Sequence, residues 1–291
     1  MNLAEIEAAI GAASGRAFVS TGHSIQGGGC INRGYGVVGN DGRRFFVKLN
    51  GLDKLDMFEA EADGLRALAA SGAIRVPQPL VSGRGGDAAF LILEWLDLDG
   101  DGRPEQLGEQ LARLHRHSQG EFGWWRDNHI GATSQHNAPS SDWVAFYRER
   151  RLRPQFELAR DNAAPRTLLR QGERLLACLE GFFPGYRPIP SLLHGDLWGG
   201  NHGYADGAPV LFDPAVYFGD READLAMTEL FGGYPPAFYA AYRAAWPLDP
   251  GYRTRARLYN LYHVLNHFNL FGAGYAAQAE AMIGRLLAES G

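Results

Sequence analysis

The sequence of 291 residues predicts an α+β fold with two lobes, a β-rich N-lobe and a mainly helical C-lobe. Two observations predict it. Strand-like runs concentrate in roughly the first hundred residues, and helical periodicity dominates after them. A stretch rich in Gly and Asp at 97–102 marks the break. We therefore place the N-lobe at 1–96 and the C-lobe at 97–291, and we expect ligand chemistry in a cleft between them.

The predicted N-lobe opens on a helix over 3–13, where apolar residues recur at helical spacing. Short apolar or β-rich runs predict strands at 17–22, 35–38, 44–49 and 89–93. The first two flank a glycine-rich loop at 26–32, and the turn Asn40-Asp41-Gly42 leads into the third. A second helix is expected over 58–70, because the segment is rich in Ala, Leu and Glu and is followed by Gly72.

The predicted C-lobe is a series of helices. The first spans 104–117 and carries Leu107, Leu111 and Leu114 on one face. Apolar periodicity predicts further helices at about 142–160, 166–182, 221–231, 236–245, 252–271 and 275–289. Two short strands are expected to interrupt them, near 192–193 and 210–212.

Composition limits the class of protein. Hydrophobic residues make up 45% and charged residues 21%, which is ordinary for a globular protein. The net charge of -5 gives no electrostatic reason to expect nucleic acid or an anionic membrane as partner. Glu5 and Glu7 stand where a secretion signal carries positive charge, and the two cysteines make no disulfide framework. We expect a cytoplasmic protein, a monomer or weak homodimer, with Cys178 in the core.

The most specific motif is His194-Gly195-Asp196-Leu197-Trp198-Gly199-Gly200-Asn201, followed by Leu211-Phe212-Asp213-Pro214. It supplies a carboxylate, an amide five positions later and a second carboxylate after the next strand. Phosphoryl transfer needs such a set, because one carboxylate accepts the substrate hydroxyl proton and hard oxygen ligands hold Mg²⁺ against the ATP phosphates. We predict Asp196 as the catalytic base, with Asn201 and Asp213 as metal ligands and ATP and Mg²⁺ as cofactors.

Three further features upstream fit a nucleotide site. Lys48 ends a strand, and a helix carboxylate is expected to fix it against the α- and β-phosphates, Glu61 first and Glu59 as the alternative. The loop containing Gly28, Gly29 and Cys30 offers backbone N–H groups to the phosphates. The segment from Glu94 to Leu96 is the expected hinge that binds adenine through its backbone.

Each residue also has a structural interpretation. Asp196 is compatible with a turn, and Glu61 with a surface ion pair to Arg66. We expect His194 to order its loop rather than to act in catalysis. Within the helix after the second motif, Asp224 is expected to accept backbone N–H groups of the catalytic loop, and Asp220 to cap the helix.

Several segments together resemble the fructosamine kinase / ketosamine-3-kinase family: GGGCIN (27–32), FFVK (45–48), MFEAEADGLRAL (57–68), LHGDLWGGN (193–201) and FDPAVYFGDREADLAM (212–227). The resemblance runs from about Gly27 to the region of Phe268. It implies a protein-kinase-like fold of the aminoglycoside and choline kinase-like group. It also implies phosphorylation of the sugar 3-hydroxyl of glycated amines, which destabilises the adduct and frees the amine.

Carried over by position, the resemblance gives Asp196, Asn201, Asp213 and Lys48 the roles stated above. It also makes Trp198 and the segment around His267 candidates for a sugar pocket, since an aromatic face suits a sugar and an imidazole suits its hydroxyls. A core helix with buried aromatic residues explains the segment around His267 equally well. Cys30, among N–H donors, is either a redox-sensitive thiol or a plain small side chain.

The chain departs from protein kinases in one informative way. Only six residues separate Asp213 from Asp220, which leaves no room for an activation loop. A small or protein-linked ketosamine is therefore the expected substrate. Two alternatives stay open: a kinase of another small molecule, such as an aminoglycoside, choline or a homoserine-like compound, and a nucleotide-binding protein without activity.

Overall fold

The computed structural model describes residues 2–27, 31–98 and 100–289, and the chain divides into two compact units. The N-terminal unit comprises the residues up to Arg103 together with Gly200–Pro214. The C-terminal unit comprises Pro104–Gly199 and the residues from Ala215 onward. The predicted lobes divided the chain once, after residue 96, whereas the contacts place a later segment with the N-terminal unit.

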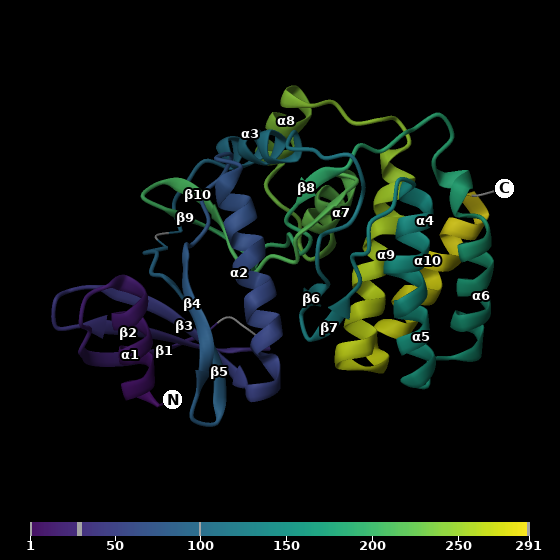
Figure 1. Ribbon diagram of the computed structural model, residues 1–291. Helices are drawn as coiled ribbons and strands as arrows, with labels where there is room; N and C mark the ends of the chain where they lie inside the picture. The colour runs from purple at the N-terminus through teal and green to yellow at the C-terminus, as the bar shows by residue number, and fades with distance from the viewer. Residues whose placement is uncertain (1, 28–30, 99, 290–291) are drawn as a thin grey trace. The chain divides into compact units, whose positions relative to one another are not determined.

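The N-terminal unit is built on a five-stranded antiparallel sheet (Figure 1). Its strands are ordered β1-β2-β3-β5-β4. Their bounds are β1 Ser20–Gln26, β2 Arg33–Gly39, β3 Arg44–Gly51, β4 Pro79–Gly85 and β5 Ala88–Glu94. Two helices pack on this sheet, α1 (Leu3–Ser14) and α2 (Leu55–Ala70). The predicted strands at 35–38, 44–49 and 89–93 and both predicted helices are confirmed, whereas β4 was not predicted.

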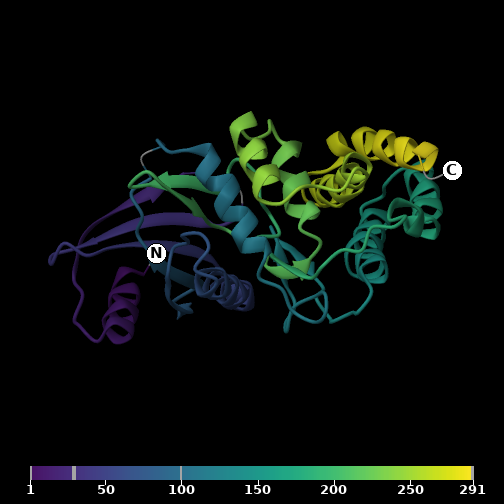
Figure 2. The same cartoon turned by 90° about the horizontal axis from the view of Figure 1, so that it is seen from above.

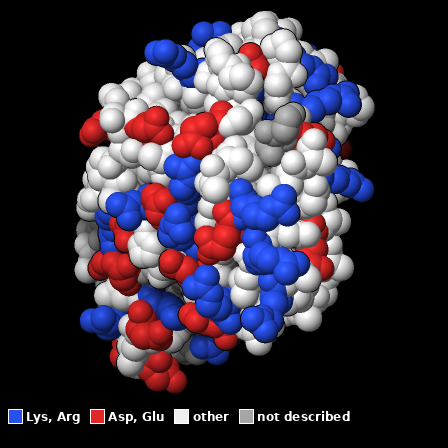
Figure 3. All heavy atoms as spheres, turned by 90° about the vertical axis from the view of Figure 1, so that its right-hand side faces the viewer, with Lys and Arg blue, Asp and Glu red and all other residues white. Residues whose placement is uncertain are grey.

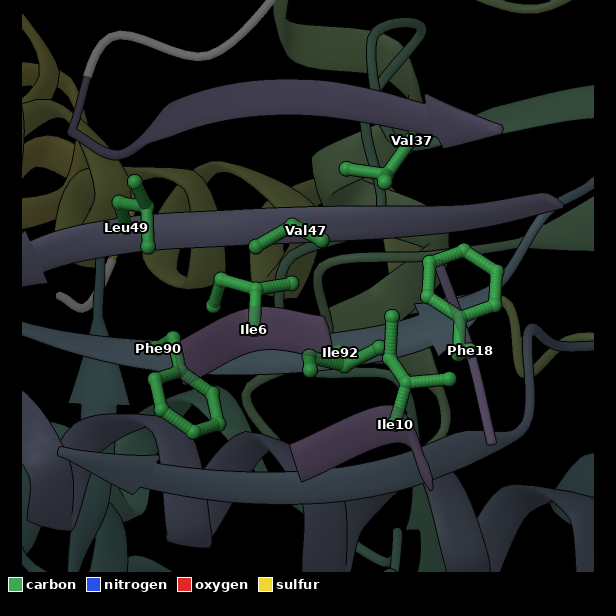
Figure 4. Packing of buried hydrophobic residues seen from close by; sticks show 8 residues of the cluster. All are labelled: Ile6, Ile10, Phe18, Val37, Val47, Leu49, Phe90 and Ile92. Carbon is green, nitrogen blue, oxygen red and sulfur yellow. The ribbon is translucent and has the colours of Figure 1, made fainter. Parts of the chain in front are cut away.

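The core between α1 and the sheet explains which way Lys48 points (Figure 4). Ile6 and Ile10 of α1 pack against a set of buried sheet residues that includes Val47 and Leu49 of β3. Each such buried aliphatic side chain contributes about 1.5–3 kcal/mol to stability. Because neighbouring residues of a strand point to opposite faces, burying Val47 and Leu49 beneath α1 directs Lys48 to the other face of the sheet.

A short hairpin from the middle of the sequence completes the N-terminal unit. It consists of β9 (His202–Ala205) and β10 (Ala208–Leu211). Val210 forms a parallel bridge with Arg75, and the backbone N–H of Leu211 donates to the Arg75 carbonyl at 3.0 Å. Tyr204 lies so close to Gly102 that a Cβ there would come within 1.8 Å of its ring. These contacts attach Gly200–Pro214 to the N-terminal unit.

The C-terminal unit is mainly helical (Figures 1 and 2). Its helices are α3 Pro104–His115, α4 Trp143–Tyr147, α5 Arg153–Asp161, α6 Arg166–Ala177, α7 Glu222–Leu230, α8 Pro236–Ala245, α9 Tyr252–Phe271 and α10 Ala276–Glu289. The buried helix α9 packs against α5, α7 and α10. Helix α3 crosses α8 at Gly108, where a Cβ would approach the Phe238 carbonyl oxygen to 2.3 Å.

Two short strand pairs accompany these helices: β6 (Asn128–Ile130) with β7 (Thr133–Gln135), and β8 (Ser191–Leu193) with β11 (Tyr217–Gly219). Only β8 among these four was predicted. The single helix expected at about 142–160 is broken by a π-helical turn at Arg148–Leu152, which carries the fully buried Arg151. Arg151 donates to the His136 carbonyl at 2.5 Å and to Asn137 Oδ1 at 2.7 Å, so these acceptors compensate its burial.

The surface of the C-terminal unit carries charges of both signs. On the face seen in Figure 3, side chains of Lys and Arg and of Asp and Glu are interspersed over much of the area. Helix α6 contributes exposed Arg166, Arg170 and Arg174 along with exposed Glu173. No helix in the described part of the chain is both long enough and apolar enough to span a membrane.

Candidate active site

The N-terminal unit holds a buried ion-pair cluster around Lys48. The Lys48 Nζ lies 2.6 Å from Glu61 Oε1 on α2 and 2.5 Å from Asp213 Oδ1 beyond β10. Glu61, rather than the alternative Glu59, is therefore the helix partner of this lysine. Arg66 instead pairs with Asp63.

Burial alone would lower the pKa of Lys48, because it disfavours the charged amine. The carboxylates of Asp213 and Glu61 outweigh this effect and raise the pKa above its usual value. Lys48 is thus a fixed cation at neutral pH. Its amino group contacts Asp213 and would also be placed to contact a polyanionic ligand.

The hairpin β9–β10 brings the two predicted metal ligands to one place. Asn201 directly precedes β9 and Asp213 follows β10, and His202 pairs with Leu211 in the antiparallel register. The two ends of the hairpin are therefore neighbours, with the Asn201 Nδ2 3.5 Å from the Asp213 carbonyl oxygen. Asp213 has φ of 58°, a left-handed conformation whose cost is of order 1–3 kcal/mol and which is common at functional sites. An amide oxygen and a half-exposed carboxylate suit Mg²⁺, a hard cation.

The loop that carries Asp196 follows β8 in the C-terminal unit, and its backbone is fixed by hydrogen bonds. Asp224 on α7 accepts the backbone N–H of His194 at 2.7 Å and that of Gly195 at 2.8 Å. Gly195 has φ of 84°, and a Cβ there would lie 2.0 Å from the Ala215 carbonyl oxygen. Only glycine fits at this position. The backbone N–H of Asp196 donates to His194 Nδ1 at 3.3 Å, so His194 orders the loop as predicted.

Asp224 is itself held by residues that the sequence did not single out. The buried ring of His115, at the end of α3, places Nε2 3.2 Å from Asp224 Oδ2 and Nδ1 2.8 Å from the Tyr242 hydroxyl. Arg221 donates to that same hydroxyl at 3.2 Å. Burial would raise the pKa of Asp224, but the hydrogen bonds from His115 and the loop backbone keep it below its usual value. Asp224 therefore anchors the loop as a carboxylate.

Trp198 and His267 lie in one aromatic cluster of the C-terminal unit. The ring of Phe231 contacts both, with ring centroids 6.3 Å from Trp198 and 4.7 Å from His267. The Tyr234 hydroxyl donates to the Trp198 carbonyl at 3.0 Å. No sequence pattern singled out Phe231, because its neighbours in space come from distant segments.

The remaining predicted positions have different outcomes. The backbone N–H of Glu94 donates to the Gln78 carbonyl oxygen at 2.8 Å, so this N–H group is not available to adenine. Leu96 is half-buried and stays a prediction. Gly28, Gly29 and Cys30 lie outside the described residues. Asp220 Oδ1 accepts the backbone N–H of Glu222 at 3.0 Å in the first turn of α7, which agrees with its predicted capping role.

The structure thus assembles two sets. Lys48, Glu61, Asn201 and Asp213 meet in the N-terminal unit. In the C-terminal unit, the loop that carries Asp196 continues into Trp198, whose cluster includes His267.

Comparison with known proteins identifies relatives along nearly the whole chain. The sequence model of the family described as fructosamine kinase matches residues 2–289. A "Probable ketoamine kinase" of Synechocystis sp. is 46% identical over 269 residues, covering 89% of this chain and 88% of that protein. The "Protein-ribulosamine 3-kinase, chloroplastic" of Arabidopsis thaliana is 42% identical over 264 residues, covering 88% and 80%.

Solved structures show the same fold. A "putative fructosamine-3-kinase" of Thermobifida fusca is 34% identical and superimposes with a TM-score of 0.85, covering 97% of this chain and 98% of that one. A macrolide 2'-phosphotransferase of type I, at 16% identity and a TM-score of 0.62, shares the fold alone. The predicted α+β, protein-kinase-like fold is confirmed, and the chain belongs to the fructosamine kinase family.

Proposed function

We propose that this protein is an ATP- and Mg²⁺-dependent ketosamine 3-kinase, which transfers the γ-phosphoryl group of ATP to the sugar 3-hydroxyl of a glycated amine. The observation that carries the proposal is the buried Lys48, shared between Glu61 and Asp213 in a chain of the fructosamine kinase family. A lysine on a strand, paired with a helix carboxylate and a metal-binding aspartate, is the arrangement that phosphoryl transfer uses.

In this proposal the N-terminal unit binds the nucleotide. Lys48 donates to the phosphate oxygens, and the backbone N–H groups of the loop around Gly28, Gly29 and Cys30 cover them. Asn201 and Asp213 would hold Mg²⁺, which neutralises charge on the phosphates when bound. The segment ending at Leu96 is the proposed adenine hinge.

The C-terminal unit supplies the base. Asp196 accepts the proton of the sugar 3-hydroxyl. The hydroxyl oxygen forms a bond to the γ-phosphorus while the bond between that phosphorus and the ADP oxygen breaks. Because five peptide units link Asp196 to Asn201, their Cα atoms are at most about 18 Å apart, whatever the arrangement of the two units. Asp224 and His115 keep the loop in one conformation, which lowers the entropy cost of positioning the base.

The proposed substrate class follows from the family and from the aromatic cluster. Relatives carry the names ketoamine kinase and protein-ribulosamine 3-kinase. We propose that Trp198 stacks on the sugar and that His267 lies beside it. Phosphorylation at the 3-position destabilises the adduct, so the product releases its amine. A cytoplasmic protein that is a monomer or weak homodimer fits this role.

One assay tests the proposal. ATP consumption is measured with a fructosyl-lysine and a ribulosyl-lysine compound, and with choline and an aminoglycoside as alternative acceptors. The proposal predicts turnover of at least one ketosamine and none of the other two. Turnover of choline or the aminoglycoside alone would assign a different small-molecule kinase, and ATP binding without any turnover would indicate an inactive nucleotide-binding protein.

A further inference from the structure

Five aromatic side chains form a continuous group on the C-terminal unit, which we call the aromatic surface: Trp198, Phe231, His267, Phe271 and Tyr275. Beyond the contacts of Phe231 with Trp198 and His267, the His267 ring lies 5.5 Å from Phe271 and 5.2 Å from Tyr275 between centroids. Trp198 is 36% exposed and Phe271 53% exposed. The aromatic surface therefore extends outward from the catalytic loop into solvent.

The aromatic surface is held by three elements that pack together. His267 and Phe271 are one turn apart on α9, so they share a face of that helix. Phe231 directly follows α7, which packs along α9, and Tyr275 ends the 3₁₀ turn Ala273–Tyr275 that follows α9. The hydrogen bond from the Tyr234 hydroxyl to the Trp198 carbonyl oxygen holds the backbone of Trp198 in place. The rings are thus positioned before any ligand arrives.

The aromatic surface is electrically neutral but able to accept a hydrogen bond. His267 Nδ1 lies 2.8 Å from the His263 carbonyl oxygen, so this nitrogen carries the proton and Nε2 is left as an acceptor. Burial lowers the pKa of His267, and it lowers the pKa of His263 to about 3. Both imidazoles are neutral at pH 7, and among the described residues no Lys or Arg stacks on the five rings.

The loop after β8 relates the aromatic surface to the base. The Trp198 backbone N–H donates to the Asp196 carbonyl oxygen at 3.2 Å, so the aromatic surface begins beside the proposed base. From Trp198 it continues through Phe231 to His267. In a ketosamine, three carbons separate the 3-hydroxyl oxygen from the amine nitrogen. A ligand with its 3-hydroxyl at Asp196 can therefore direct its amine along the aromatic surface toward His267.

We propose that the part of the aromatic surface beyond Trp198 binds the amine-bearing half of the ketosamine, namely its secondary ammonium group and the apolar carbon chain attached to it, while Trp198 contacts the sugar. This inference rests on the proposed function and extends it to the amine. Ring faces attract an ammonium group, His267 Nε2 accepts its N–H, and Phe271 and Tyr275 cover the carbon chain.

The proposal predicts a preference among amines. A carboxylate next to the nitrogen would meet the negative faces of the rings and a hydrogen-bond acceptor, and no Lys or Arg of the described residues stacks on these rings to offset them. Adducts of apolar amines should therefore be better substrates than adducts of α-amino acids. The ratio of kcat/KM for fructosyl-benzylamine to that for fructosyl-glycine measures this preference.

The test compares this ratio in the wild type, in Phe271→Ala and in Trp125→Ala, the last being a control at another exposed aromatic residue of the same unit. We expect the wild type to favour the benzylamine adduct. Phe271→Ala should lower the ratio roughly five- to tenfold, mainly through KM for the benzylamine adduct, and Trp125→Ala should leave it unchanged.

The outcomes separate this inference from the proposed function. Turnover of both adducts with the same ratio in all three proteins would remove the inference and leave the kinase assignment standing. A wild-type preference for fructosyl-glycine would also overturn it. If the wild type phosphorylates only ribulosyl compounds, the same ratio is measured with ribulosyl-benzylamine and ribulosyl-glycine. If it binds ATP and phosphorylates no fructosyl or ribulosyl adduct, the proposed function and this inference both fall.

Discussion

The two units fix their charged groups by different means. In the N-terminal unit, side chains hold side chains: Lys48 is positioned by ion pairs with Glu61 and Asp213. In the C-terminal unit, the loop that carries Asp196 is positioned through its backbone, which donates to Asp224. These two kinds of anchoring predict which property each substitution will change. Removing a charge in the first set should weaken the binding of nucleotide and metal, whereas removing Asp224 should lower kcat and leave ATP affinity intact.

The largest effect is expected at Asp213. Asp213→Asn removes the carboxylate that pairs with Lys48 and that would hold Mg²⁺, so turnover should fall on the order of a hundred- to a thousandfold. The Mg²⁺ concentration needed for half-maximal rate should rise. Asp206→Asn is a matched control, because Asp206 is on the same hairpin, also at positive φ, and exposed. Equal losses in both variants would show that the hairpin, and not the carboxylate at 213, matters.

The loop anchor comes next. Asp224→Asn retains the shape of the side chain but removes the charge that accepts two backbone N–H groups, and we expect kcat to fall roughly ten- to a hundredfold. The Kd for ATP, measured by calorimetry, should stay within about twofold, since the residues proposed to bind the nucleotide are in the other unit. A large loss of ATP affinity with unchanged kcat would contradict the expectation that Asp224 acts on the phosphoryl-transfer step and not on nucleotide binding.

A smaller effect is expected at Glu61. Glu61→Gln leaves Lys48 with Asp213 as its remaining carboxylate partner, so kcat/KM for ATP should fall about tenfold. Glu59→Gln, on the same helix but exposed, should change it less than twofold. If Glu59→Gln has the larger effect in steady-state assays, the assignment of the helix partner is wrong.

The smallest effect concerns stability and pH. Burial lowers the pKa of His263 to about 3, below the ordinary value near 6.5. A group whose pKa is lower in the folded protein than in the unfolded chain contributes stability at pH values above its unfolded-state pKa. That stability is lost as the pH falls from the unfolded-state pKa toward the folded-state pKa. Between pH 6.5 and 5 the free energy of unfolding should therefore decrease by about 2 kcal/mol on account of this group. Urea unfolding of the wild type and of His263→Gln measures it, and identical pH slopes would contradict the assignment.

Sequence reasoning predicted the regular helices well. The predicted bounds 236–245 and 252–271 agree with α8 and α9, because long periodic segments with Pro or Gly at their ends carry their own signals. The strands β6, β7, β9 and β11 were missed. Each has only three or four residues, and each depends on pairing with a partner rather than on its own composition.

The candidate site divides in the same way. Lys48, Asp196 and Asp213 stand in motifs whose order along the chain indicates phosphoryl transfer. His115 and Phe231 were not predicted, since what makes them important is a contact with Asp224 or Trp198, which lie far away in the sequence. A buried histidine at the end of an amphipathic helix has no local feature that separates it from an ordinary core residue.

The central claim is that Asp196 is the base of a phosphoryl transfer to a ketosamine. The most direct measurement is single-turnover phosphorylation of a fructosyl-lysine compound by Asp196→Asn, together with its Kd for Mg²⁺-ATP. We predict a rate lower on the order of a thousandfold and a Kd within about threefold of the wild type. Wild-type turnover by Asp196→Asn would contradict the account.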